Sequence, residues 1–209
     1  MQEIKILFHK NDLPNETAIV GKSIAIDTET MGLELSRDRL CLLQLKDESN
    51  TIHLIQFERG KYDCPNLKKI LKDKTINKIF HYARFDVLAI YTYLGVLCDN
   101  IFCTKIASKL SRTYSNKHGL KELCKELLNV DLQKEQQSSN WGAAEINTKQ
   151  QAYAADDVLY LHELKDKLTA MLKQENRLNI ASSCFNFLPT RAVLDALRFD
   201  SEDYDIFKH

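Results

Sequence analysis

The first hundred residues alternate short apolar runs with turn signals, whereas the rest of the chain has the spacing of apolar residues typical of helices. Strand character is found at 4–9, 23–28, 39–46, 51–57 and 77–82. Helical spacing is found at 66–73, from Phe85 to about Leu94, at 104–110, at 118–130 and in one long stretch from about Thr148 to Gln174. A strand-rich first half followed by helices is typical of α/β proteins. We therefore predict a central mixed β-sheet flanked by α-helices.

Nothing in the composition marks a domain boundary, because 209 residues contain only three prolines, six glycines, no linker and no repeat. We expect one domain over 1–209, with a core at about 20–173 and a carboxy-terminal helix and tail at 174–209. Pro189 is expected to break the helix before it. The tail ends in Tyr204 and Phe207, which pack either on their own domain or on a partner subunit.

The charge balance and the cysteines limit how the protein could bind nucleic acid and in which compartment it is expected. The 29 basic residues balance 29 acidic ones, whereas proteins that coat long nucleic acids are usually basic. Any nucleic acid is therefore expected in a local pocket. The six cysteines form no C-x-x-C pair, and no run approaches a membrane span. No signal-peptide cleavage site follows the amino terminus. We expect a cytoplasmic protein with reduced, mostly buried thiols.

The strand at 23–28 runs into Asp27-Thr28-Glu29-Thr30. Alternate residues of a strand share a face, so Asp27 and Glu29 lie side by side, while Thr28 points to the other face. Two adjacent carboxylates repel and raise each other's pKa. A divalent cation would remove this conflict, and a solvated strand end that turns at Gly32 is the alternative.

Two further acidic motifs stand at helices. Asp86 opens a helix, and a purely structural role there, as a cap or a partner of the helix dipole, is the alternative to a catalytic role. Tyr153 and Asp157 are one helical turn apart, and such a pair is often structural. Asp156 points about 100° away from Asp157. Asp157 borders an apolar stripe of core residues, namely Ala154, Val158, Leu161, Leu164 and Leu168.

Taken together, Asp-x-Glu, the Asp 59 residues later and the Tyr-x-x-x-Asp that ends at Asp157 resemble the three motifs of the DEDD exonuclease superfamily, in its DEDDy branch. The resemblance covers about 20–173 and implies the RNase H-like DEDD exonuclease fold. The segment 118–141 is similar to the RNase D family. The whole chain resembles the nano-RNase C family, small diribonucleases that form octameric rings. The residues beyond about 173 are too few for the HRDC domain of ribonuclease D.

The resemblance also implies roles. Two Mg²⁺ or Mn²⁺ ions would be bridged by Asp27, with Glu29 and Asp157 on the nucleophile side and Asp86 holding the other ion through water. Hard ions prefer oxygen ligands, and no Cys or His cluster suggests zinc. Tyr153 would orient or deprotonate the attacking water, and orientation is favoured because an ordinary tyrosine pKa is about 10. The products would be nucleoside 5′-monophosphates.

The expected substrate is short RNA, most specifically a diribonucleotide. Leu33 corresponds to the leucine wedge between two bases in oligoribonucleases, and an ordinary core leucine is the alternative. Tyr82 and Phe85 are candidates for base stacking. A 5′-phosphate cap, formed within one subunit or across a boundary, would come from a segment that could equally be a solvated loop; its candidates are Lys109, Arg112, Tyr114, Lys117 and His118.

Two other functions remain open. A general 3′–5′ exonuclease would act on longer RNA or DNA, as RNase D and proofreading domains do. A catalytically dead exonuclease fold would only bind RNA.

Overall fold

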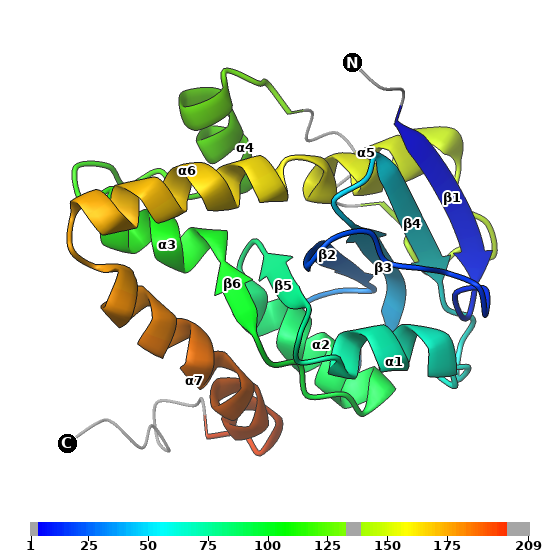
Figure 1. Cartoon of the computed structure of the whole chain (residues 1–209). Coiled ribbons are helices and arrows are strands. Elements are labelled where there is room, and N and C mark those ends of the chain that lie inside the picture. Colours follow the sequence, from blue (N-terminus) through cyan, green and yellow to red (C-terminus); the bar gives the residue numbers. More distant parts are fainter. Residues whose placement is uncertain (1–3, 133–138, 200–209) are drawn as a thin grey trace.

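A computed structural model describes residues 4–132 and 139–199 (Figure 1). Its six-stranded sheet has the order β1-β4-β3-β2-β5-β6. β3 pairs antiparallel with β2 and β4, whereas β1–β4, β2–β5 and β5–β6 are parallel. The strands span Lys5–Lys10 (β1), Ser23–Thr30 (β2), Leu40–Lys46 (β3), Thr51–Gln56 (β4), Asn77–Phe80 (β5) and Ile101–Cys103 (β6). The predicted fold class, a mixed sheet flanked by helices, is confirmed.

The helices follow and interrupt the strands. They span Pro65–Lys72 (α1), Ala83–Leu94 (α2), Thr104–Ser111 (α3), Leu120–Leu123 (α4), Thr148–Leu159 (α5), Leu161–Gln174 (α6) and Leu178–Ala196 (α7). A π-helical turn over Cys124–Leu128 continues α4. None of the helices in the described ranges is long and apolar enough to cross a membrane.

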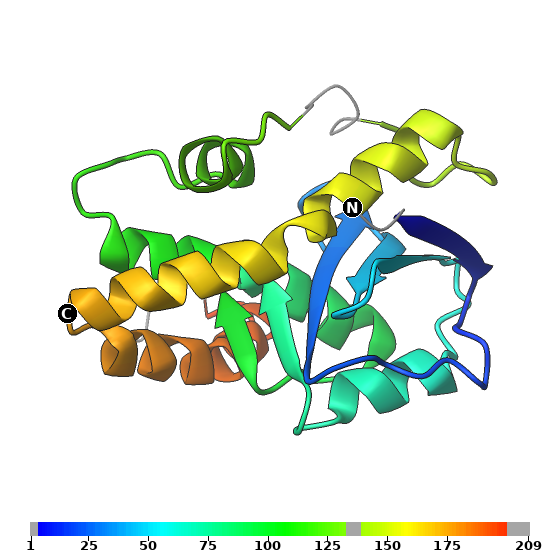
Figure 2. The same cartoon turned by 45° about the horizontal axis from the view of Figure 1, so that its top comes forward.

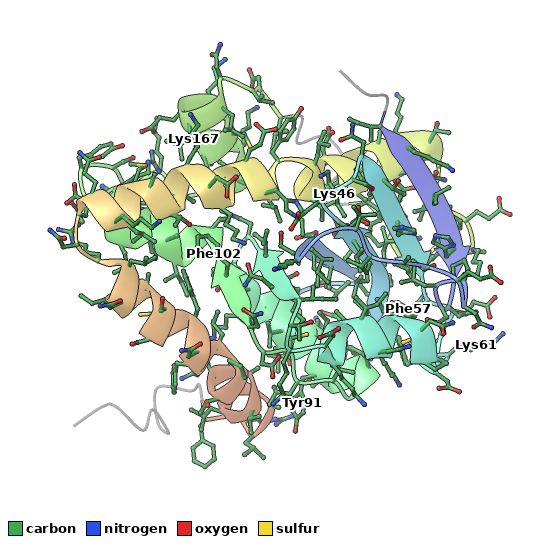
Figure 3. All side chains as sticks on the ribbon, in the orientation of Figure 1. Lys46, Phe57, Lys61, Tyr91, Phe102 and Lys167 are labelled. Atoms are coloured by element: carbon green, nitrogen blue, oxygen red, sulfur yellow. The ribbon has the colours of Figure 1, made fainter. Side chains whose placement is uncertain are left out.

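The two faces of the sheet are covered by different helices. α5 packs on β2, β3 and β4, and α6 packs on β2 and β5, while α2 lies against the opposite face (Figure 2). β3 is buried along its whole length because it is covered on both faces. Phe57 and Phe102 belong to the core, whereas Lys61 and Lys167 lie on the surface (Figure 3). The predicted stripe of Ala154, Val158, Leu161, Leu164 and Leu168 is buried throughout.

Two expectations about the elements were wrong, and one strand was missed. The long helix predicted for 148–174 is broken at Tyr160, whose φ of −102° and ψ of 1° lie outside helical values. Its apolar stripe continues across the break, so spacing alone cannot reveal it. Pro189 lies inside α7, which runs on because buried Leu188 and Ala192 anchor it on both sides of the proline. β6 was missed because its three residues are too few for a pattern.

All six cysteines are free in this structure, and all except the half-buried Cys184 are buried. Tyr204 and Phe207, the aromatic residues of the predicted tail, lie outside the described residues.

Candidate active site

An acidic cluster lies where the end of β2 meets α5. Asp27, Glu29 and Asp157 each offer a carboxylate oxygen, and these atoms all lie within 4.8 Å of one another. Asp27 and Glu29 point to the α5 face of the sheet, as expected from the alternation of side chains along a strand. The β2–β3 register shifts directly after Glu29, so regular pairing ends at the cluster. Such bulges often re-aim side chains beside functional sites.

Asp86 reaches the same region from the other face. It lies in the first turn of α2 and is buried, and the Thr28 hydroxyl donates a hydrogen bond of 2.7 Å to its Oδ1. Thr28 thus holds one predicted ligand while its neighbour Asp27 presents another. Asp86 lies outside the 4.8 Å cluster, but its charge contributes to the raised pKa of Asp27.

The four carboxyl groups have raised pKa values, and burial is the largest cause in each. The pKa of Glu29 rises to about 9. The pKa values of Asp86 and Asp157 rise to about 7. Burial, followed by the charges of its three acidic neighbours, holds the pKa of Asp27 well above its usual range. No lysine or arginine within 4–132 and 139–199 forms an ion pair with any of the four.

This donor set fits a divalent metal. Closely spaced, half-buried carboxylates that form no ion pair with lysine or arginine destabilise one another by repulsion. A hard divalent ion, which prefers oxygen ligands, would remove that repulsion. Asp27, Glu29 and Asp157 are the residues that would hold it directly, and Asp86 is the nearby fourth carboxylate.

The raised pKa values predict how the stability of the metal-free protein depends on pH. A carboxyl group whose pKa is higher in the folded than in the unfolded chain stabilises the fold at low pH and loses this contribution as pH rises through the folded pKa. Unfolded carboxyl groups titrate near about 4. We therefore expect the Tm in EDTA to fall between about pH 5 and pH 9, on the basis of the folded values of about 7 and 9.

Circular dichroism melts with EDTA and with saturating Mg²⁺ would check this expectation. The ion favours the deprotonated carboxylates, so Mg²⁺ should flatten the decline. A Tm in EDTA that rises across this range would show that the carboxyl groups are not mutually destabilised.

Tyr153 lies one turn before Asp157 on α5, with its hydroxyl beside the Asp157 carboxyl group. Burial, followed by the charge of Asp157, raises the pKa of Tyr153. The phenol is thus held protonated at neutral pH, and it can orient a water molecule better than it can deprotonate one. The ring of Trp141 packs against the ring of Tyr153, with 6.1 Å between the two ring centres, and this contact helps to position the tyrosine.

A cavity of about 720 Å³ opens over the cluster. Leu33, Tyr82 and Phe85, the residues predicted to contact bases, all line it, together with the acidic cluster and Tyr153. Leu33 is 85% exposed, so the alternative of an ordinary core leucine is wrong. Tyr82 has a φ of 70°, an uncommon conformation for an aromatic residue that is often retained at functional sites.

The segment predicted to cap a 5′ phosphate lies elsewhere. Arg112 is fully buried, and its guanidinium group donates to Glu126, to Ser108 Oγ at 2.9 Å and to the Lys117 carbonyl at 2.8 Å. It therefore organises the loop after α3 and does not line the cavity over the acidic cluster of its own chain, so a cap across a subunit boundary stays a prediction. The sequence displays the cations of this segment but not the carboxylate that neutralises them.

The other candidates of this segment are also absent from the cavity lining. His118 Nδ1 lies 2.8 Å from the same Ser108 hydroxyl, and Tyr114 donates to Glu126. Lys109 and Lys117 do not line the cavity either.

Sequence reasoning missed the cations that do line this cavity, Lys105 and Lys121. Lys105 Nζ lies 4.0 Å from the centre of the Tyr82 ring, a cation–π contact that places its charge beside the predicted stacking residue. His81 also lines the cavity. Burial lowers the pKa of its imidazole to about 3, so the ring is neutral. The only signal for Lys105 was its position at the start of the helix at 104–110.

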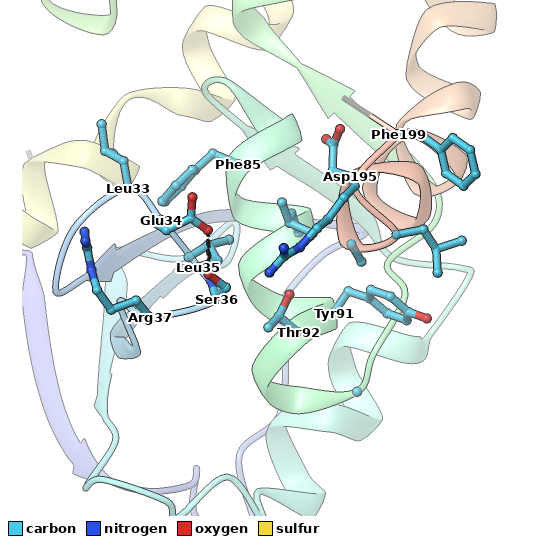
Figure 4. A pocket seen from close by; sticks show the side chains of 15 residues that line it. Leu33, Glu34, Leu35, Ser36, Arg37, Phe85, Tyr91, Thr92, Asp195 and Phe199 are labelled. Atoms are coloured by element: carbon cyan, nitrogen blue, oxygen red, sulfur yellow. Dashed lines mark hydrogen bonds between the residues drawn. The ribbon is translucent and has the colours of Figure 1, made fainter. Parts of the chain in front are cut away.

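A second and larger cavity of about 1390 Å³ adjoins the first (Figure 4). It is lined by the loop after β2, by α2 and by the end of α7, and it shares Leu33 and Phe85 with the catalytic cavity. It lacks the acidic cluster. The larger space is thus not where the chemistry would occur, and Leu33 belongs to the walls of both.

Comparison with known proteins agrees with this geometry. A family model described as 3′-5′ exonuclease matches residues 1–173. The chain belongs to the 3′–5′ exonuclease family. The residues that this exonuclease brings together are those of the motifs predicted from the sequence.

Two curated relatives match only in part. DNA polymerase I of Aquifex aeolicus is 35% identical over 149 residues, which are 71% of this chain and 24% of that protein. Ribonuclease D of Gluconacetobacter diazotrophicus is 31% identical over 161 residues, which are 77% of this chain and 40% of that protein. The chain thus spans less than half of the length of these relatives.

The solved structures of Brucella melitensis NrnC match along the whole chain. The structure of NrnC bound to pGG has a TM-score of 0.93 at 48% identity and covers 99% of this chain and 100% of that one. The structure of NrnC with bound Mg²⁺ has a TM-score of 0.92 and covers 98% of this chain and 99% of that one. The predicted resemblance to the nano-RNase C family is confirmed.

Proposed function

We propose that this exonuclease removes nucleotides from the 3′ end of short RNA, most specifically from diribonucleotides, and releases nucleoside 5′-monophosphates. The observation that carries the proposal is the exposed Leu33 in a cavity of about 720 Å³ that is also lined by the acidic cluster and by the rings of Tyr82 and Phe85. Two bases separated by a leucine and stacked on aromatic rings would fill this space. The similarity to NrnC, solved with pGG, supports the same substrate class.

Two divalent ions, Mg²⁺ or Mn²⁺, would activate water and stabilise the leaving 3′ oxygen. Asp27, Glu29 and Asp157 would provide the oxygen ligands, and Thr28 keeps Asp86 in place as the fourth carboxylate. The protonated hydroxyl of Tyr153 would orient the attacking water.

A 5′ phosphate would be recognised by the cationic side chains that line the cavity, Lys105 and Lys121. Arg112 is buried and paired with Glu126, whereas Lys105 lines the cavity beside Tyr82. A terminal phosphate that lies near Tyr82 would therefore meet Lys105.

The runner-up function is a general 3′–5′ exonuclease on longer RNA or DNA. The second cavity beyond Leu33 favours it, because that space would give a longer chain a path within a single subunit. The third function, a catalytically dead RNA-binding module, does not fit, because the four carboxylates and Tyr153 are brought together.

We expect 5′-phosphorylated RNA dimers to be cleaved at least about tenfold faster than trimers or longer chains, a difference of about 1.4 kcal/mol or more in activation free energy. Contacts that only the correct length satisfies also place the scissile phosphate, so they should appear in kcat/KM. A series of end-labelled substrates from two to seven nucleotides, with products identified by chromatography, would check this. An enzyme that gains affinity from every added phosphate would instead cleave the longer chains faster than the dimer.

Leu33→Ala should narrow the length preference and leave Mg²⁺ binding unchanged, because Leu33 touches the bases and not the ions. Leu35→Ala is a matched control, since Leu35 lies two residues later but is buried. A Leu33→Ala enzyme with the full wild-type preference would remove the wedge from the proposal.

We also propose a cytoplasmic homo-oligomer that consists of one exonuclease domain per chain, with a core at about 20–173 and a carboxy-terminal helix and tail at 174–209. The family resemblance implies a closed octamer, and a symmetric interface would cover part of the exposed apolar surface. That surface includes Ile4, Ile6, Ile180, Leu197 and Phe199. Light scattering at low micromolar concentration should return a mass near eight subunits, and a monomer mass would contradict the assembly.

A further inference from the structure

Gln44 has a buried amide group without a hydrogen-bond partner. The side chain lies in the middle of β3 and is 0% exposed. Neither Nε2 nor Oε1 has a partner among the described residues. A buried polar group without a partner costs folding free energy, and an apolar side chain of the same length would avoid that cost. Packing alone therefore does not explain a glutamine at this position.

The position of Gln44 relates it to the acidic cluster. In the antiparallel β2–β3 ladder, Gln44 is the direct partner of Asp27. Direct partners share a face of the sheet, with Cβ atoms about 4.5–5.5 Å apart. This is the face that carries Asp27 and Glu29 and that α5 covers. The amide thus lies beside the carboxylate that is central to the predicted metal site.

We infer that Gln44 is a positioning residue for Asp27. When a divalent ion is bound, the Nε2–H group of Gln44 would donate a hydrogen bond, directly or through one water, to the Asp27 carboxylate, whereas the two groups are not hydrogen-bonded in this structure. Carboxylate ligands are commonly oriented by such partners, whose loss typically weakens metal affinity by about 10–100-fold. The inference rests on the proposed function, since it requires that Asp27 binds a divalent ion.

The residue type suits this role. A lysine or arginine opposite Asp27 would neutralise the carboxylate and compete with the ion. A glutamate would add a fifth acidic group to a site whose four carboxyl pKa values are already raised. A neutral amide orients Asp27 without changing the charge of the site.

The test compares wild type with Gln44→Met, which keeps the length of the side chain and removes the amide. Leu42→Met is the matched control, because Leu42 lies on the same face of β3 opposite Glu29. Mn²⁺ affinity is measured by calorimetry, thermal unfolding is measured in EDTA, and kcat and KM are measured on a 5′-phosphorylated RNA dimer. Gln44→Leu repeats the comparison in a second apolar side chain.

We expect Gln44→Met to weaken Mn²⁺ binding by about tenfold or more and to lower kcat with little change in KM. Its Tm in EDTA should equal or exceed that of wild type, and Leu42→Met should show none of these effects on binding or kcat. Unchanged Mn²⁺ affinity would overturn the inference. A lower Tm in EDTA for both Gln44 variants would also overturn it, because the amide would then serve the fold. A wild-type protein that binds no Mn²⁺ would instead overturn the proposed function, and this inference with it.

Discussion

Replacing Asp27, Glu29, Asp86 or Asp157 with alanine is expected to remove nearly all turnover of a diribonucleotide, with a fall in kcat of at least about 10³-fold for each variant. The four side chains come from β2, α2 and α5, and we propose that they act as one metal-binding unit, so the loss of one should affect the whole site. The measurement is the release of nucleoside 5′-monophosphate at saturating Mg²⁺.

The same variants should be at least as stable as wild type when no metal is present. Each removes one of four carboxyl groups whose pKa values are raised by burial, and for Asp27, Glu29 and Asp157 also by acidic neighbours. Melts in EDTA would therefore separate loss of chemistry from loss of fold.

Asp156→Ala is the matched control on the same helix. Asp156 neighbours Asp157 in the chain but does not line the catalytic cavity. Its removal should change kcat by less than about threefold, as expected for a substitution outside a site that acts as a unit. An essential Asp156 beside a dispensable Asp157 would show that the third motif was assigned to the wrong residue.

Tyr153→Phe is expected to lower kcat by about 10²–10⁴-fold, the usual contribution of a group that positions or transfers a proton. The phenylalanine ring would keep its packing against Trp141, and the variant would lose the hydroxyl beside Asp157. Mg²⁺ affinity and Tm should change little, because the hydroxyl contacts the water and not the ions.

The pH–rate profile adds a further check on Tyr153. Because its pKa is raised, a tyrosine that acts in its protonated form should cause no loss of rate by deprotonation near neutral pH. A Tyr153→Phe enzyme with the wild-type rate would remove the tyrosine from the mechanism.

The chemistry of this site could be predicted from the sequence because its residues stand at positions with simple geometry. Asp27 and Glu29 alternate along a strand, and Tyr153 and Asp157 are spaced by one helical turn, so the shared faces follow from the chain itself. The topology of the fold brings Asp86 and Asp157 to β2. Their proximity was predicted from the family resemblance, because residue spacing does not reveal which elements lie side by side.

The substrate residues were harder, because their roles depend on which groups neutralise or cover them. The sequence alone suggests that Arg112 is an unpaired cation, and the fold shows that its guanidinium group donates a hydrogen bond to Glu126. Lys105 gave almost no signal, although it lies over the ring of Tyr82. Gln44 is likewise an ordinary strand residue until the β2–β3 register places it opposite Asp27.

Competition between two substrates in one reaction is the most direct test of the proposed selectivity for diribonucleotides. A 5′-labelled RNA dimer and a 5′-labelled seven-mer, both 5′-phosphorylated and at equal concentration, are mixed with wild-type enzyme and Mg²⁺, and the ratio of the two rates gives the ratio of kcat/KM. We expect the dimer to disappear at least about tenfold faster and EDTA to stop both reactions. Equal rates for the two substrates, or a faster seven-mer, would contradict a diribonucleotide-selective enzyme and leave the general exonuclease in its place.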